Sequence, residues 1–589
     1  MEPKGDVHNA LLSVFNIVRD ESAWMIDADE YHAGLYCASD KAGVKGSSRR
    51  GYEYGPATLP YNVCRGAVDT LQSKIAQHRP LPEVLTQQGD WKLQKRAKKQ
   101  TQFLEGEFYR QKVFEKHGPN IVRDAEIFGR GAVKIWTDKK RIRTERTHVW
   151  ELFYDQWDAR YGEPRNLYHC RSMDRGVAVE TFARTDSGSL RKSLVDAIDK
   201  AGRFGMATGR EDSSSSSTVD RVDVLEAWHL PSGEQAKDGR HVVVVQGATL
   251  LDEPWEVEYF PFATLTYNEP ITGAQGHGLV EQLEGYQYEI NLASEKSSEQ
   301  FRMSGKLILI PDGSGIYDSE IRNGMTLCKH KAGMPPQVFD MDMVNEHMHQ
   351  RPRLLTQDAL GDSGLSAMST RSEKPAGIDS GVGLQTLDDI ESERFMIFGR
   401  AYESWCIEIA RRFIDCAKEI AAEYGDMAVS VPMRGGLLDL NWNDVVIDGV
   451  ELRIFSSSLL PSQPAARLDR LQKMFDAEII DRKTFYRHLD APDMQAEMDL
   501  EVADQLVVDE MLEFMLDAEE DQGEAAYMPP SAYQDLEWAG RRCQQKLNRA
   551  TLGRAPEYNK AMLRRFLKDV DREKAKLPPP MPPAAAAAA

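Results

Sequence analysis

The chain has 589 residues, and its 93 Asp and Glu outweigh 73 Lys and Arg to give a formal net charge of −20. This length allows several domains and a sizeable core, while the negative charge argues against a simple non-specific DNA-binding protein, which normally has a basic surface. The seven Cys lack CxxC or Cys/His zinc spacing, so we expect reduced thiols, no disulfide framework and no metal site. The sequence has no apolar run of about 18 residues and no N-terminal signal pattern, so we expect an intracellular protein with no membrane span.

Residues 1–275 predict an α+β region in which helices come first and an antiparallel sheet follows. One helix shows the pattern most clearly, because Val63, Ala67, Leu71 and Ile75 recur every four residues before Pro80 ends it. We expect helices at 7–25, 61–80, 90–117, 121–128 and 178–204, and strands at 132–136, 147–156, 163–173, 222–231, 240–251 and 260–270.

Residues 276–304 predict one long helix. Its apolar stripe consists of Leu279, Leu283, Tyr286, Ile290, Ala293 and Ser297, whereas Glu281, Glu284, Glu295 and Glu299 lie largely off that stripe. Apart from Gly285, nothing interrupts the run from Leu279 to Met303, which at about 1.5 Å per residue gives a rod roughly 35–40 Å long. Because the stripe is narrow, we expect this helix to pack against neighbouring copies of itself.

A small β module (305–340) with two short strands follows, and then a helical segment (341–361) that Pro352 is expected to kink or break. Residues 362–384 are rich in Gly and Ser and predict a long loop. A second long helix is expected at 385–425, and strands at 426–462. The apolar face of this second long helix consists of Ile390, Ile397, Ala401, Trp405, Ile409, Phe413, Cys416 and Ile420.

The C-terminal part (463–576) is expected to be helical, with a low-complexity tail at 577–589. An acidic segment at about 509–524 precedes a basic one at 541–576, in which twelve Lys or Arg face four Asp or Glu. The basic segment is expected to meet DNA, a neighbouring subunit or the acidic segment before it.

No catalytic signature stands out. The sequence contains neither a GxxxxGK[ST] phosphate loop nor a GxSxG nucleophile elbow. The run GAQGHG at 273–278 is not a GxGxxG fingerprint and indicates a flexible start to the long helix. We therefore expect no enzymatic activity, no catalytic residues and no cofactor.

The order of these segments resembles the portal proteins of tailed bacteriophages, the head-to-tail connectors. The resemblance covers nearly the whole chain and is carried by several stretches in a fixed order, with no single diagnostic motif. These stretches are YNVCRGAVDTLQSKIA, AEIFGRGAVKIW, THVWELFYDQ, DVLEAWHLP, the helix–β module–helix–loop–long helix series, and PAARLDRLQKMFDAEIIDRKTFYRHLDAPD.

The resemblance implies a mostly helical α+β portal-type fold that assembles as a ring around an axial channel, typically of about twelve subunits. Residues 1–275 would be the wing, 276–304 and 341–361 the two stem helices, 305–340 the clip and 362–384 the tunnel loop. Residues 385–425 and 426–462 would be a long wing helix and wing strands, and 463–576 the crown.

The resemblance also implies partners and a location. Double-stranded DNA would pass through the channel during packaging and ejection, without base readout and without a membrane. The clip would dock the terminase large subunit during packaging and the tail adaptor afterwards, and the ring would meet the major capsid or scaffolding protein. The protein would be assembled in the host cytoplasm and reside in the virion, at one capsid vertex.

Site candidates follow from these parts. Arg371 and Lys374 are the candidates for DNA contact in the tunnel loop, against the alternative that they are solvated loop charges. Lys329 and Lys331 are the candidates for partner docking in the clip. Arg564, Arg565 and Lys568 are the candidates for DNA-side contact in the basic C-terminal segment.

Two other classes of protein remain open. A nucleic-acid-processing enzyme of the packaging machine, such as a nuclease or ATPase, would need phosphate-binding or clustered metal-binding residues. Another structural head–tail ring protein, such as an adaptor, is commonly much shorter than this chain.

Overall fold

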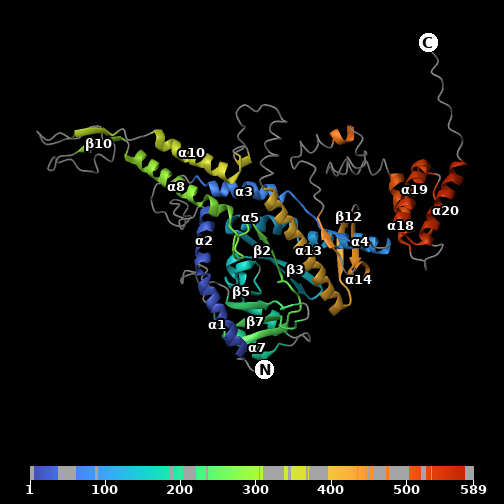
Figure 1. The fold of residues 1–589 in the computed structure, drawn as a ribbon, viewed down its shortest axis with the longest axis horizontal. Helices are drawn as coiled ribbons and strands as arrows, with labels where there is room; N and C mark the ends of the chain where they lie inside the picture. The colour runs from blue at the N-terminus through green and yellow to red at the C-terminus, as the bar shows by residue number, and fades with distance from the viewer. Residues whose placement is uncertain are drawn as a thin grey trace, which may run out of the picture. The chain divides into compact units, whose positions relative to one another are not determined.

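The structure is a computed structural model. It describes residues 6–37, 61–86, 91–162, 164–184, 190–202, 220–233, 236–303, 305–309, 337–341, 346–366, 369–370, 395–433, 436–446, 451–454, 472–476, 503–518, 526–531 and 533–576. These residues form a mostly helical α+β protein, as the sequence predicts (Figure 1). No helix within these ranges is long and apolar enough to cross a membrane.

The elements are as follows. The helices are α1 (Asp6–Glu21), α2 (Ala23–Cys37), α3 (Val63–Ala76), α4 (Trp91–Arg110), α5 (Gly118–Phe128), α6 (Arg175–Ala178), α7 (Lys192–Lys200), α8 (Leu279–Met303), α10 (Glu346–Ser363), α13 (Met396–Tyr424), α14 (Trp442–Val445), α18 (Ala503–Asp517), α19 (Leu536–Leu552) and α20 (Glu557–Lys574). The strands are β1 (Glu83–Leu85), β2 (Arg130–Asp138), β3 (Arg141–Thr147), β4 (Leu152–Phe153), β5 (Asn166–Asp174), β6 (Arg221–His229), β7 (Arg240–Val245), β8 (Ala248–Pro254), β9 (Phe262–Thr266), β10 (Gly305–Leu309), β11 (Gln337–Met341), β12 (Ala428–Met433), β13 (Gly436–Asn441) and β14 (Glu451–Arg453).

The chain divides into two compact units that cut across the expected segment boundaries. The first unit contains residues 1–77, 112–136 and 144–405, and the second contains 78–111, 137–143 and 406–589. The helix α13 therefore contributes its residues up to Trp405 to the first unit and those from Cys406 onward to the second.

The first unit contains a five-stranded antiparallel sheet with strand order β4-β5-β6-β7-β8 and a smaller sheet with order β3-β2-β9. The run of four valines in β7 is buried on both faces of the larger sheet. Val242 and Val244 pack with Phe15 and Val18 of α1, whereas Val243 and Val245 pack on the opposite face. That opposite face is covered by Leu194 and Ile198 of α7. Alternation with period two explains why successive valines belong to different cores.

The helix α8 matches the uninterrupted run expected from Leu279 to Met303. It is followed by the antiparallel hairpin of β10 and β11, in which Gly305 pairs with Met341 and Leu309 with Gln337. The helix α10 then returns beside α8, so that the hairpin lies at the end of a helix pair within the first unit (Figure 1). The two short strands expected in this module are thereby confirmed.

The expected helix at 178–204 is wrong, and of the two effects expected of Pro352, a kink or a break, the break does not occur. Pro352 lies inside α10 without ending it; it is buried, and its carbonyl accepts a hydrogen bond from Thr356 Oγ1 at 2.6 Å. Packing of this segment outweighs the missing backbone donor of proline. The expected helix at 178–204 is interrupted instead. It consists of α6, a π turn (Val179–Ala183), an extended Arg184 and then α7, with Asp, Ser and Gly residues in the sequence between them.

Residues 147–156 also differ from the expected strand. Only Leu152 and Phe153 form β4, because a 3-10 turn at Val149–Glu151 precedes them. The expected long helix at 385–425 is confirmed from Met396 to Tyr424, while residues 385–394 lie outside the described part of the chain. Ile397, which the pattern assigned to its apolar face, is exposed instead.

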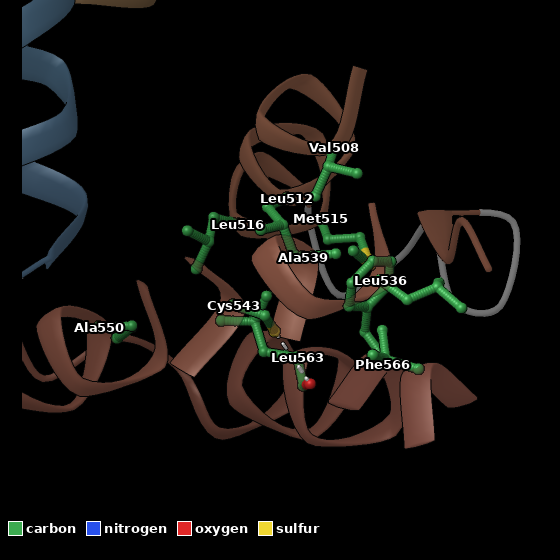
Figure 2. Packing of buried hydrophobic residues seen from close by; sticks show 12 residues of the cluster. Val508, Leu512, Met515, Leu516, Leu536, Ala539, Cys543, Ala550, Leu563 and Phe566 are labelled. Atoms are coloured by element: carbon green, nitrogen blue, oxygen red, sulfur yellow. Dashed lines mark hydrogen bonds between the residues drawn. The ribbon is translucent and has the colours of Figure 1, made fainter. Parts of the chain in front are cut away.

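The second unit has two hydrophobic parts. In one, Phe103 and Phe108 of α4 pack against Trp442 of α14 and Phe413 of α13, with ring centroids 5.1 and 5.5 Å apart. In the other, α18, α19 and α20 form a helical bundle whose apolar side chains share one core (Figure 2). There Cys543 Sγ donates a hydrogen bond to the carbonyl of Leu563 at 3.4 Å.

Candidate functional site

The root of α8 is fixed by close contact between backbones. Gly129 ends α5 with a φ of +82°, and a Cβ placed on it would lie 1.9 Å from the carbonyl oxygen of Gly276. A Cβ on Gly276 would in turn lie 2.4 Å from the Gly129 oxygen. Only glycine fits at either position. Gly129 and Gly276 therefore form a close-packed joint at the start of α8, whereas Gly273, at the other end of the GAQGHG run, has open space where a Cβ would lie.

Hydrogen bonds reinforce this joint. Gln275 Nε2 donates to the carbonyl of Phe128 at 3.1 Å, and its Oε1 accepts from Tyr154 at 3.2 Å. The backbone N–H of His277 donates to the carbonyl of Asn268 at 3.0 Å. The start of α8 is thus bonded to the end of α5 and to the segment that follows β9.

A buried amide holds the middle of α8. Gln287 is 1% exposed, and its Oε1 accepts from the Val63 N–H at 2.8 Å, where α3 begins. Its Nε2 donates to the Tyr61 carbonyl at 2.8 Å and to Asn291 at 2.9 Å. Because a buried amide without partners is costly, Gln287 fixes the register of α8 against α3. The stripe pattern gave no signal for it, since Gln287 is polar.

The stripe of α8 is covered by this chain itself. Leu279, Leu283 and Ile290 are buried, and α8 contacts α2, α3, α5 and α10. The sequence argument that so narrow a stripe must pack against another copy is therefore wrong for these residues. Among the side chains described on this helix pair, the exposed large apolar ones are Tyr288 of α8 (58%) and Leu354 of α10 (56%).

Polar pairs join α8 to α10. Tyr286 donates a hydrogen bond to Asp362, and Arg351 Nη2 lies 3.1 Å from Glu289 Oε2. The Asp362 carboxylate raises the pKa of the Tyr286 hydroxyl by accepting this bond. Both pairs are exposed, so they orient the helices more than they stabilise them.

Two glutamates proposed to lie off the stripe have partners within the chain. Glu281 faces His277 Nδ1 at 3.1 Å, and Glu284 faces His32 Nε2 at 3.4 Å. Glu295 lies on α8 with its side chain partly exposed, and the side chain of Glu299 lies outside the described part of the chain. Glu281, Glu284 and Glu295 thus place solvent-accessible carboxylates along the helix α8.

Four of the proposed site residues lie outside the described residues. These are Arg371 and Lys374 of the tunnel loop and Lys329 and Lys331 of the clip. Their proposed roles stay predictions.

The three C-terminal candidates are all exposed on α20 but differ in their contacts. Arg564 Nη1 lies 2.5 Å from Glu557 Oε1, and the Arg565 guanidinium lies 4.3 Å from the ring centroid of Tyr527. Lys568 lies one turn beyond Arg564 on the same face.

Part of the basic segment meets the acidic segment before it. Arg542 Nε and Lys546 Nζ of α19 lie 2.7 and 3.2 Å from Asp509 of α18. Lys546 is also 3.6 Å from Glu513. For these two cations, contact with the acidic segment is the alternative that the structure supports.

In the part of the chain that the structure describes, no three His, Cys, Asp or Glu side chains come together in a way that would hold a metal ion. Burial raises the pKa of the Cys64 thiol to about 12 and also raises that of Cys416. These thiols are therefore protonated and are poor nucleophiles.

No protein-family model matches this chain, and no curated protein matches it either.

Proposed function

We propose that this protein forms an oligomeric ring around an axial channel through which a linear polymer passes. Within that class, we propose that it is the portal protein of a tailed bacteriophage. In this role it admits double-stranded DNA during packaging, releases it during ejection, and occupies one capsid vertex of the virion. The terminase large subunit, the tail adaptor and the major capsid or scaffolding protein are its proposed partners.

One observation supports this proposal above the others. The pair of α8 and α10 ends in the β10–β11 hairpin, and its root is fixed by the joint between Gly129 and Gly276. A rod held at one end can present its outer face to a neighbouring copy and its hairpin to another protein. Tyr288 and Leu354 are the large apolar side chains that remain exposed on the described part of this pair, and tyrosine is among the residues that are enriched at interface hot spots.

Ring formation is the direct test. We expect electron microscopy of the purified full chain to show rings with a central hole, and light scattering to give a mass of many subunits. A stable monomer under all assembly conditions would contradict the proposal. Tyr288→Asp with Leu354→Asp is expected to reduce ring formation at least tenfold, because each change places a charge where a neighbour would pack.

A matched control is Tyr533→Asp, since Tyr533 is 97% exposed and belongs to the other compact unit. It is expected to leave ring formation unchanged, and circular dichroism of all variants checks their fold. Robust ATP or DNA hydrolysis by the pure protein would instead favour an enzyme of the packaging machine.

A further inference from the structure

The turn between β2 and β3 concentrates positive charge in this acidic protein. Its sequence Asp138-Lys-Lys-Arg-Ile-Arg places four cations within five residues. Lys139 has a φ of +54°, in the left-handed region that residues other than Gly and Asn rarely adopt. Two-residue hairpin turns favour Asn and Gly, so local backbone preference does not account for lysines here.

The hairpin tip borders a hollow in the second unit. The hollow has a volume of about 430 Å³, which is large enough for a group of several atoms. Its lining consists of Arg110, Gln111, Lys140, Arg141, Ile142, Arg143 and Ala428.

A buried carboxylate holds one of the lining residues in place. Glu107 of α4 is fully buried, and burial raises its pKa while the Arg110 guanidinium lowers it. Arg110 Nη1 donates to Glu107 at 3.0 Å, and its Nη2 donates to the carbonyl of Ala428 at 3.0 Å. Gln111 Nε2 donates to the carbonyl of Ile142 at 2.7 Å. These bonds fix Arg110 and join the end of α4 to both β3 and β12.

The walls keep an excess of positive charge. Arg143 pairs with Asp138 at 3.1 Å, and the Lys140 ammonium lies 5.8 Å from the ring centroid of Tyr424. Arg141 is exposed and also lines the hollow. The lining holds four cations. Arg110 pairs with Glu107 and Arg143 pairs with Asp138, so Lys140 and Arg141 supply two further positive charges for which the described residues show no paired carboxylate.

We propose that this hollow binds a phosphate group. Two residual positive charges match the charge of phosphate, and the exposed planar guanidinium of Arg141 offers the paired donors that phosphate oxygens accept. A phosphate can come from a free phosphate compound or from a nucleic-acid backbone, and the chemistry of the site is the same for both. The inference does not depend on the proposed ring.

The test uses the full chain and two probes, inorganic phosphate followed by calorimetry and a short labelled DNA duplex followed by fluorescence anisotropy. Lys140→Gln with Arg141→Gln is expected to weaken binding of at least one probe tenfold or more. If the duplex is the ligand, the magnitude of the slope of log K against log salt falls by about one, for the one phosphate contact that the hollow supplies. Loss of phosphate binding alone identifies a small phosphate compound as the source.

Arg191→Gln with Lys192→Gln is the matched control, because it removes two adjacent exposed cations from the other compact unit. It is expected to leave both affinities unchanged, and Arg141→Lys is expected to retain most binding. The inference is overturned if the wild-type chain binds neither probe, or if the hollow variant and the control bind equally. Rings seen by microscopy in either case would leave the proposed function standing.

Discussion

Replacing Gly276 by Ala tests whether the root of α8 is a close-packed joint. The added Cβ would lie 2.4 Å from both the Gly129 oxygen and Thr266 Cγ2, and 3.0 Å from the Asn268 oxygen. Two of these three atoms belong to the backbone, so α8 and α5 must separate by roughly an ångström to restore van der Waals contact. We expect this overpacking to cost about 1–3 kcal/mol.

Gly285→Ala is the matched control because it makes the same chemical change on the same helix. Gly285 is exposed, and an added Cβ would meet no atom within 4 Å. Alanine lowers the backbone entropy of the unfolded chain and favours helix, so this change is expected to stabilise by about 0.5–1 kcal/mol.

The two variants should therefore move stability in opposite directions. Thermal unfolding gives the sign for the whole protein, and hydrogen exchange of peptides from α8 reports on the joint itself, because local opening precedes global unfolding. Gly276→Ala should speed exchange at the start of α8, whereas Gly285→Ala should slow it. If Gly276→Ala stabilises as much as Gly285→Ala does, the joint is not close-packed and the reasoning fails.

Three further outcomes are expected. In the wild type the buried Lys134 ammonium lies 2.5 Å from Glu226, and Glu226→Gln leaves it without a charged partner. The free energy of unfolding in urea should fall by about 3–5 kcal/mol, and the double change Glu226→Leu with Lys134→Met should recover most of this loss. Burial lowers the pKa of His169 to about 3 and of His117 to about 4, so the unfolded chain binds protons that the fold does not. These two groups should then lower stability from pH 6.5 toward pH 4 by up to about 1.4 kcal/mol per pH unit each, against the opposite contribution of Asp29, whose pKa burial raises to about 8. Replacing each histidine by Gln should therefore reduce the loss of stability on acidification relative to the wild type, and an unchanged difference in thermal unfolding between pH 6.5 and pH 4 would contradict this. Asp509→Asn removes the partner of two cations on α19 and should cost about 1 kcal/mol, seen as faster proteolysis of the C-terminal bundle; unchanged cleavage would exclude a stabilising role.

Local periodicity in the sequence predicted the elements that have a regular pattern. The spacing of Val63, Ala67, Leu71 and Ile75 gave α3, and all four side chains are buried. The run from Leu279 to Met303 gave α8. In both cases the residues that define the face lie within one element, so a single stretch of sequence contains the whole signal.

Features that depend on a distant partner could not be predicted in this way. Gln287 is polar and lies beside an apolar stripe, and its role depends on the backbone of Tyr61 and Val63, more than 220 positions away. The fit of Gly129 against Gly276 is equally non-local. Each glycine alone indicates only a break or a flexible start, because the atoms that exclude a side chain belong to the other segment.

Pro352 shows the same limit for local rules. A proline removes one backbone donor wherever it occurs, but the helix continues when packing supplies more than the roughly 3 kcal/mol lost. Pro352 is buried, and the helix that contains it packs on α8. The sequence shows the proline, and therefore its cost to the helix, but it does not show the packing contacts that offset this cost.

The proposed channel wall accordingly rests on different residues from those that first suggested it. The apolar stripe of α8 is buried within the chain by contacts with α2, α3, α5 and α10. The narrow width of this stripe is therefore no evidence that the chain assembles into a ring. The exposed Tyr288 and Leu354 are what a neighbouring copy would cover. The acidic character of such a wall is also smaller than a count of glutamates implies, because Glu289 is paired with Arg351. A channel lined by α8 would therefore repel phosphates mainly through glutamates such as Glu281 and Glu284, whose partners are histidines that carry charge only when protonated.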